Sequence, residues 1–335
     1  MNKINNQRTT TLALLLTSLI IALFFISLTT GRHSFSLMQT VHELLAQEQS
    51  VYTLILVELR LPRSLVAIIV GATLGLCGAA MQGLLRNPLA SPGILGSSSG
   101  AALFAVIVLY FGLHSLSPWL LPLAGMAGAL LALILVYALT GNDSTITSII
   151  LAGVAINAIA AACIALAINL APSPYAVREI ALWTLGDLSK VSLQNLWLML
   201  PTTLIGWAML AGCGHALNAL SLGEQTAASM GINVSHLRWR IFLATALAVG
   251  AAVATVGAIG FIGLVIPHLL RPLVGYEPRR LLFASALGGA VMLLLADIAV
   301  RLLPTQNPLQ VGVLTALVGA PFFLYLIVKS RKVLP

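Results

Sequence analysis

The sequence predicts an all-α membrane protein that forms one domain over residues 1–335 and crosses the membrane with about ten helices. Its residues are 59% hydrophobic and only 8% charged, and the mean hydropathy of +1.02 is far above that of a soluble domain. Residues 87–142 contain no Asp, Glu, Lys or Arg. The apolar runs lack the two-residue alternation of an outer-membrane barrel, so their backbones must satisfy their hydrogen bonds within helices.

Ten apolar runs have the length and composition of helical spans. The first is interpreted as a retained span, because its apolar core at 11–28 is longer than that of a typical signal peptide and no small-residue cleavage site follows. The third and eighth are short and lie beside Gly and Pro, so their ends are the least defined. The expected spans are 11–30, 62–85, 97–113, 119–140, 144–169, 191–213, 236–257, 261–274, 279–303 and 309–328.

An even number of spans places both termini on the same side of the membrane. If that side is the cytoplasm, most of the 17 lysines and arginines are cytoplasmic, which fits the positive-inside rule. The net charge of +8 therefore reflects membrane orientation, and no nucleic-acid partner is expected. The three cysteines lie within apolar runs and lack metal-ligand spacing, so they are predicted to be buried packing residues, with no metal and no cofactor.

Two segments rich in Gly and Pro interrupt the apolar pattern, one after the second span and one after the seventh. A constant shift along the chain superimposes Gly71 on Gly250 and Pro88 on Pro267. This predicts an inverted repeat of five helices, in which the two broken segments mark a transport pathway. The second span also has a face of small residues that would let another backbone approach closely, formed by Gly71, Gly75 and Gly78.

The polar stretch 219–240 separates the sixth span from the seventh. It predicts a cytoplasmic loop at 214–235 that contains a short helix of about ten residues. Ser221 is the expected N-cap, Glu224 lies in the first turn where the helix dipole favours a carboxylate, and Gly231 ends the helix after Met230. An ordinary amphipathic linker is the alternative interpretation of this pattern.

The same stretch resembles the coupling segment of the FecCD/BtuC-type permeases, the membrane subunits of type II ATP-binding-cassette importers for iron–siderophore complexes, haem or cobalamin. The family pattern is L-x-L-G-(E/D)-x-x-A-x-x-L-G, and Met replaces its last Leu here, a change that conserves volume. The matching residues are Leu220, Leu222, Gly223, Glu224, Ala227, Met230 and Gly231.

Further motifs match this family in the same order, so the resemblance covers about 60–328. They are R-L-P-R at 60–63, N-P-L-A-S-P-G-I-L-G from Asn87, L-L-A-D ending at Asp297, and G-V-L-T-A-L-V-G-A-P-F-F from Gly312. Gln310 stands where the family usually has Pro, which affects only the entry into the last span. The signature G-x-I-x-F-(I/V)-G-L-x-x-P-H-x-x-R is met at 257–271. Together with the motifs that begin at Asn87 and end at Asp297, it supplies the expected structural residues Pro88, Gly257, Gly260, Pro267, His268, Arg271 and Asp297.

The resemblance implies a BtuC-like homodimer in the bacterial inner membrane, with both termini cytoplasmic and a pathway along the two-fold axis. Such a permease moves a bulky metal chelate by alternating access. An iron–siderophore complex is the first hypothesis for the cargo, and haem and cobalamin are the alternatives. The implied partners are two copies of an ATP-binding-cassette ATPase, a periplasmic or lipoprotein substrate-binding protein, a second copy of this chain and membrane lipid. The sequence has no P-loop motif, so the chain is not expected to be an enzyme and ATP hydrolysis is assigned to the separate ATPase.

The resemblance also assigns residues to three sites. It implies docking of the binding protein at Arg60, Arg63 and Arg301, for which snorkelling at the membrane interface is the alternative. It implies a cytoplasmic gate at Asn87, Leu89, Ile146 and Thr147. It implies coupling to the ATPase through Leu222, Gly223, Glu224, Ala227, Met230 and Gly231.

Two ionisable residues within the expected spans bear on the transport mechanism. His268 is predicted to be hydrogen-bonded to backbone carbonyls freed at a helix break, with a haem ligand or a proton carrier as the alternatives. Asp297 has Arg301 four residues further on, so a paired and partly solvated carboxylate is predicted. An ion-coupled secondary transporter, the alternative from another class, would need an unpaired mid-membrane carboxylate. An intramembrane enzyme is disfavoured, because the sequence resembles no catalytic constellation.

Overall fold

The computed structural model describes residues 2–31, 37–46, 50–141, 145–303 and 309–331, and all regular structure among them is helical. This confirms the predicted all-α fold. The short turns are the π-helical η1 (Ile55–Arg60) and the 3₁₀ turns η2 (Pro92–Leu95) and η3 (Leu113–Ser115). The α-helices are α1 (Asn2–Thr29), α2 (Leu37–Leu45), α3 (Val51–Leu54), α4 (Leu61–Leu84), α5 (Ser97–Tyr110), α6 (Leu120–Thr140), α7 (Ile146–Asn169), α8 (Pro174–Thr184), α9 (Leu193–Ala211), α10 (Gly214–Leu220), α11 (Glu224–Ser229), α12 (Val234–Val256), α13 (Ile262–Leu270), α14 (Pro278–Leu302) and α15 (Val311–Arg331).

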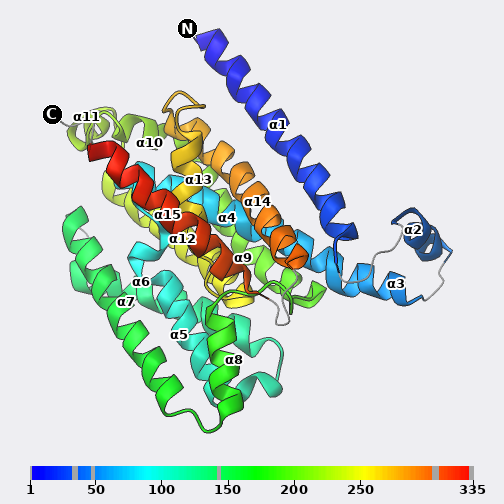
Figure 1. Cartoon of the computed structure of the whole chain (residues 1–335). Coiled ribbons are helices and arrows are strands. Elements are labelled where there is room, and N and C mark those ends of the chain that lie inside the picture. Colours follow the sequence, from blue (N-terminus) through cyan, green and yellow to red (C-terminus); the bar gives the residue numbers. More distant parts are fainter. Residues whose placement is uncertain (1, 32–36, 47–49, 142–144, 304–308, 332–335) are drawn as a thin grey trace.

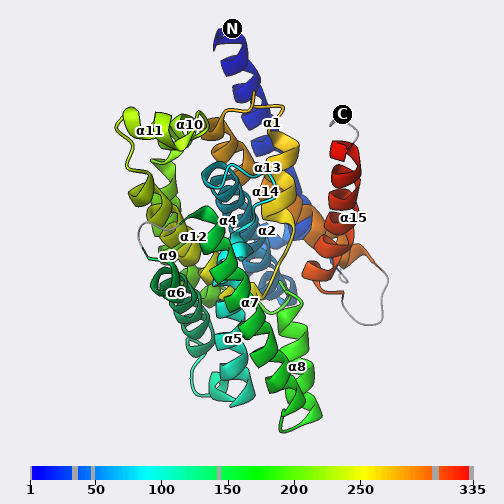
Figure 2. The same cartoon turned by 90° about the vertical axis from the view of Figure 1, so that its left-hand side faces the viewer.

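Helix α4 is the central element of the bundle, where it contacts α1, α9, α12, α13 and α14 (Figure 1). The start of α1, the end of α15 and the short helices α10 and α11 all lie at one end of the molecule. Helix α8 lies at the opposite end (Figures 1 and 2). The two ends of the described chain thus share a side with the predicted coupling loop. Their placement in the cytoplasm stays a prediction.

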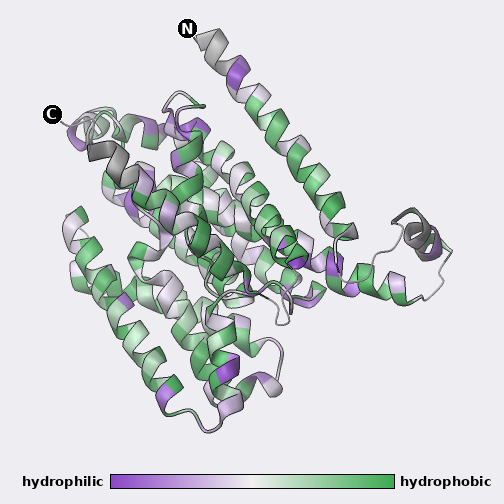
Figure 3. Ribbon diagram, viewed as in Figure 1, coloured by the Kyte–Doolittle hydropathy of each residue, from purple (hydrophilic) through white to green (hydrophobic). Residues whose placement is uncertain are grey.

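The surface of the bundle is apolar over most of the length of its long helices, and hydrophilic residues gather at helix ends and loops (Figure 3). Among the described residues, six helices are long and apolar enough to cross a membrane, or seven if the pair α9–α10, bent by 49°, forms one span. Each of the ten expected spans contains a helix. However, α13 has only nine residues, which rise about 14 Å, roughly half of the hydrocarbon thickness. The number of crossings and the inverted repeat therefore stay predictions.

Helix α8 lies outside the ten expected spans. Its start has local cues, because the Ser173 hydroxyl accepts a hydrogen bond from the backbone N–H of Ala176 at 3.2 Å and Pro174 occupies the first helical position. Its eleven residues are too few to form a span. A search for long apolar runs passes over such a segment.

Helices α4 and α14 pack with their backbones in contact. A Cβ atom added to Gly75 would lie 1.9 Å from the carbonyl oxygen of Ser285, and one added to Gly71 would lie 2.3 Å from that of Gly289. On the neighbouring face, a Cβ on Gly78 would lie 1.9 Å from the carbonyl oxygen of Gly263 in α13. The predicted small-residue face of the second span is confirmed, and it serves two helices rather than one.

The Gly75→Ala variant should therefore separate α4 from α14 and lower the melting temperature of the purified protein. Overpacking of this kind costs about 1–3 kcal/mol, and the neighbouring atom is a backbone carbonyl oxygen that cannot rotate away. The matched control is Gly93→Ala, where the added Cβ would meet only the Ser91 hydroxyl at 3.9 Å. Equal melting temperatures for the two variants in detergent would contradict the proposed backbone contact.

Candidate functional site

The predicted coupling loop contains two short helices, α10 and α11, rather than one. The expected N-cap is wrong: Ser221 is the C-cap of α10, and its hydroxyl donates to the backbone carbonyl of Asn218 at 2.6 Å. Helix α10 continues this far because Leu217 and Leu220 are fully buried. Gly223, with φ 113°, then turns the chain and caps α11, which places Glu224 in the first helical turn as predicted.

The end of α11 is the predicted glycine cap. Gly231 has a left-handed φ of 83°, its N–H donates to the Ala228 carbonyl at 2.9 Å, and the Ile232 N–H donates to the Ala227 carbonyl at 3.0 Å. These two bonds form a Schellman motif, which satisfies the last carbonyls of a helix. The helix has six residues, shorter than the predicted ten, because the turn at Gly223 removes its first part.

Apolar side chains just before and just after α11 are exposed, at the end of the molecule where α1 begins. Ala227 is fully buried and anchors the helix, whereas Leu222 and Met230 are 66% and 60% exposed. Glu224 lies 3.9 Å from the guanidinium of Arg238 in α12, which ties the start of α11 to the bundle. The loop is thus an anchored element with a free apolar surface, which is typical of a docking site.

At the N-terminal end of α4, two of the predicted docking arginines cap the C-terminal end of helix α1. Arg60 donates to the carbonyls of Leu28 and Thr29 at 2.7 and 2.8 Å. Arg301 donates to the carbonyls of Ser27 and Thr30 at 2.8 and 3.1 Å. Cationic side chains are favourable at a helix C-terminus, where the last carbonyls lack intrahelical partners.

Asp297 joins two arginines from different helices. Its Oδ1 atom lies 2.7 Å from both Nε and Nη2 of Arg63 in α4, and its Oδ2 atom lies 2.6 Å from Nη2 of Arg301. The predicted pairing with Arg301 is confirmed. The predicted partial solvation is wrong, because the side chain of Asp297 has no exposed surface and Arg63 covers its other side. A carboxylate with two cationic partners is a poor coupling group for an ion-driven transporter.

The three docking candidates are therefore brought together at one place, but they are largely engaged within the chain. Arg60 is buried, and the side chains of Arg63 and Arg301 are 17% and 10% exposed. Simple solubilising or snorkelling roles do not fit such burial. The role of these arginines in docking stays a prediction.

The two predicted gate segments belong to elements that pack against each other. Asn87 accepts the Leu89 N–H at 2.9 Å in the turn after α4, and Leu89 is exposed. Ile146 and Thr147 open α7, which packs on η2 further along the same turn segment. There, Asn157 of α7 donates to the Gly93 carbonyl at 3.0 Å. The role of these segments as a gate stays a prediction.

The 257–271 signature forms the second break in the apolar chain. Gly257 has φ 75°, and a Cβ there would lie 2.1 Å from the Trp183 carbonyl, so only glycine fits this approach. Gln82 of α4 donates to the Leu264 carbonyl at 3.1 Å and accepts from Arg271 at 2.5 Å, which fixes α13 against α4. Pro267 is buried within α13.

The hydrogen bond predicted for His268 is not found. Among the described residues, no group accepts from or donates to its Nδ1 atom, although that atom is buried. Pro267 has no backbone N–H, so a carbonyl of the preceding turn lacks its usual helical donor. That carbonyl does not accept a hydrogen bond from the imidazole of His268. Its role therefore stays open between the alternatives stated above.

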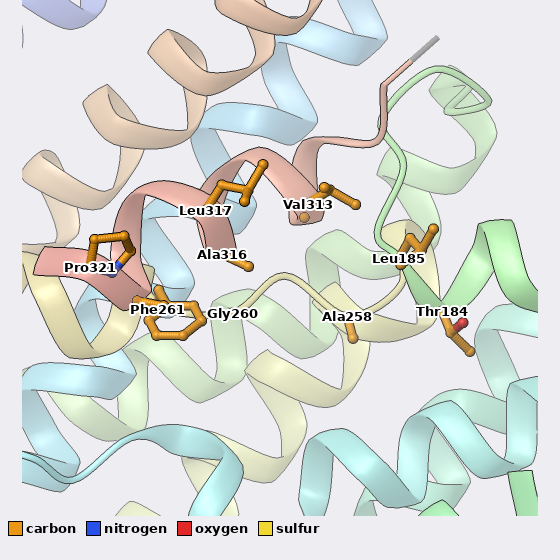
Figure 4. Close-up of a pocket in the computed structure, with 11 residues that line it drawn as sticks. Thr184, Leu185, Ala258, Gly260, Phe261, Val313, Ala316, Leu317 and Pro321 are labelled. Carbon is orange, nitrogen blue, oxygen red and sulfur yellow. The ribbon is translucent and has the colours of Figure 1, made fainter. Parts of the chain in front are cut away.

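A pocket of about 540 Å³ lies between α15 and the segment that joins α12 to α13 (Figure 4). Ala258, Gly260 and Phe261 form one wall, and Ala316 and Pro321 of α15 belong to the opposite wall. The lining is mainly aliphatic and aromatic. Gly260 of the signature thus lines this cavity and does not pack closely against a helix. A Cβ atom added there would meet nothing within 4 Å.

Comparison with known proteins identifies this arrangement. Residues 19–329 match the model of the FecCD transport family. The chain belongs to this family. The hemin transport system permease HmuU of Yersinia pestis is 40% identical over 285 residues, which cover 82% of this chain and 83% of that protein. The vitamin B12 import system permease BtuC of Salmonella paratyphi A is 40% identical over 276 residues, with coverage of 82% and 84%.

Solved structures support the same assignment. An inward-facing transporter assigned to the metal-chelate ABC type has 31% identity and a TM-score of 0.84, and the alignment covers 96% of this chain and 99% of that one. PsaBC of Streptococcus pneumoniae, solved with an antibody fragment, has a TM-score of 0.51 at 18% identity over 87% of this chain and 95% of that one, which shows only a shared fold. This FecCD-family chain is thus a multi-pass permease subunit of the importers that work with an ATPase and a substrate-binding protein.

The Asp297→Asn variant should destabilise the FecCD-family chain. Loss of the carboxylate leaves Arg63 and Arg301 close together without a counter-ion, and breaking a buried ion pair costs roughly 3–5 kcal/mol. The expected result is a clear fall in melting temperature in detergent. Glu58→Gln, at an exposed position of η1, is the control and should leave the melting temperature unchanged. An Asp297→Asn protein as stable as the wild type would contradict a stabilising role for the Asp297 ion pairs with Arg63 and Arg301.

Proposed function

We propose that this chain forms, as a homodimer in the bacterial inner membrane, the pathway through which an ATP-driven importer moves a bulky metal chelate. The observation that carries the proposal is the family match over residues 19–329, together with about 40% identity to permeases named for hemin and vitamin B12. The apolar pocket beside α15 supports passage of a large rigid cargo without tight polar selection. The buried, doubly paired Asp297 speaks against the ion-coupled alternative.

For the cargo, we propose an iron–siderophore complex first. Haem and cobalamin are the alternatives, and they are the cargoes in the names of the relatives. In an importer of this class, a separate binding protein makes the polar contacts that select the cargo. The permease motifs described above therefore do not distinguish the three chelates.

The cargo is tested with the permease reconstituted in vesicles with the ATPase that co-purifies with it. Substrate-binding protein loaded with a ferric siderophore should stimulate ATP hydrolysis and import, and the empty binding protein is the control. If only binding protein loaded with haem or cobalamin stimulates hydrolysis, the siderophore would be rejected as the cargo, while the importer proposal would stand. If no ATPase co-purifies with the wild-type chain, the importer proposal itself fails.

We propose that the binding protein docks on the rim of the arginine cluster. Two arginines share the single carboxylate of Asp297, so the cluster keeps a positive charge that would attract acidic side chains. Arg63 and Arg301 keep small exposed edges for this contact, whereas Arg60 is buried and acts as a cap for α1. The gate at Asn87, Leu89, Ile146 and Thr147 is proposed to close the other end of the pathway.

We propose that α11 transmits force from the ATPase. The exposed Leu222 and Met230 that flank it supply apolar contact area, and buried Ala227 holds the helix against the bundle. Nucleotide-driven closure of the ATPases would move this anchored helix and shift the pathway between its two openings.

The Gly231→Val variant should uncouple hydrolysis from transport while the bundle stays folded. No neighbour lies within 4 Å of a Cβ at this position, so the cost is confined to the left-handed backbone, at about 1–2 kcal/mol. Gly231→Asn is the matched control, because Asn tolerates this conformation. We expect the Val variant alone to lose stimulation of the ATPase by loaded binding protein. Equal transport by both variants would contradict a coupling role.

A further inference from the structure

A second cavity, of about 200 Å³, lies at the end of the molecule that carries α10 and α11. It opens between the end of α4, the turn after α10 and the loop that joins α13 to α14. Its polar lining consists of Gln82, Arg86, Ser221, Arg271 and Tyr276. Arg271 also fixes α13 against α4 through Gln82, but none of the roles discussed above explains a second arginine, Arg86, in the same cavity.

The charge of this cavity is not balanced within the described chain. Among the described residues, the side chain of Arg86 forms no hydrogen bond or ion pair, and that of Arg271 donates only to the neutral amide oxygen of Gln82. Glu277, which follows Tyr276 along the chain, is engaged elsewhere, with Arg280 and with the amide of Asn218. The cavity therefore offers two guanidinium groups to an anion.

Two residues that line the cavity have a strained backbone conformation that glycine would relieve. Arg86 and Tyr276 have φ of 48° and 61°, the left-handed region that costs a non-glycine residue about 1–2 kcal/mol. Arg86 follows the C-cap of α4, and the next N–H, of Asn87, donates to the Gln82 carbonyl at 3.2 Å. This is the position where helices usually have Gly. The arginine side chain is kept there at a cost in stability, which points to a function.

The position of the cavity indicates from which side an anion would enter it. The last turn of α4 packs against α10 and α13, since a Cβ on Gly83 would lie 3.3 Å from Leu217 and Gln82 bonds to Leu264, while Arg86 itself is exposed at this end of the bundle. Ser221, on the cavity wall, belongs to the turn that leads into α11. An anion would therefore reach the cavity from the aqueous side on which α11 is proposed to meet the ATPase.

We propose that this cavity receives an acidic side chain of the ATPase subunit, which pairs with Arg86 and Arg271. The inference rests on the proposed function, because it requires an ATPase at this end. It adds a second contact beside α11, one that acts on α4 and α13 directly. The carboxylate would offset one of the two positive charges of the cavity and hold the turn after α4 in its strained conformation.

The decisive variant is Arg86→Gly, in complexes co-expressed with the ATPase that co-purifies with the wild-type chain. Glycine removes the backbone strain, so the melting temperature of the permease alone should be unchanged or higher. The loss of a charge-assisted contact should weaken ATPase binding by about tenfold or more. Arg178→Ala, in α8 at the opposite end, is the control and should change neither quantity. If Arg86→Gly fails to fold, Arg86→Asn keeps the left-handed backbone and tests the same charge.

Charge reversal identifies the partner residue. Arg86→Glu should abolish assembly, and replacement of one surface acid of the ATPase by Lys should restore it. Equal affinity of wild type and Arg86→Gly for the ATPase would overturn this inference but leave the proposed importer function untouched. An effect of Arg86→Gly that disappears in pure phosphatidylcholine nanodiscs would assign the cavity to anionic lipid, and competition by inorganic phosphate without any rescuing ATPase residue would assign it to a free anion. Either result would also overturn the inference.

Discussion

The structure depends on one constraint: within a membrane, each backbone carbonyl and N–H must find its partner in the protein, because lipid offers none. Where a helix ends or breaks, side chains from its neighbours supply the missing partners. Arg60 and Arg301 cap the carbonyls of α1, and Gln82 of α4 meets a carbonyl of α13. At the second break, the Asp187 N–H donates to the Val256 carbonyl at 2.8 Å. These contacts tie the end of α1 to α4 and α14, and they tie α13 to α4.

Sequence reasoning succeeded where the deciding interaction is local. The spacing of Gly71, Gly75 and Gly78 indicated a face for close helix packing, and the four-residue spacing of Asp297 and Arg301 indicated a pair on one helix face. The family motifs identified the FecCD permeases correctly, since each motif is short, ordered and contiguous.

Sequence reasoning failed where the deciding contact joins distant segments. Arg63 meets Asp297 from a position 234 residues away, and this contact excludes the solvent that the local pair alone would have kept. Ser221 satisfies the general rule for an N-cap, but burial of Leu217 and Leu220 extends the preceding helix over it. Only the tertiary structure decides between such local possibilities.

Helix α4 connects the two ends of the molecule that carry the proposed contacts. Its N-terminal end is joined to α14 through Arg63 and Asp297, and its C-terminal end is joined to α13 through Gln82. Between these points, glycine contacts leave no space for α4 to slide independently of α14. A displacement imposed at the turn after α4 would therefore move α13 and α14 together rather than bend α4 alone. Because α13 begins at the break that borders the apolar pocket, this rigid connection would give the side proposed to meet the ATPase a direct mechanical route to the proposed pathway.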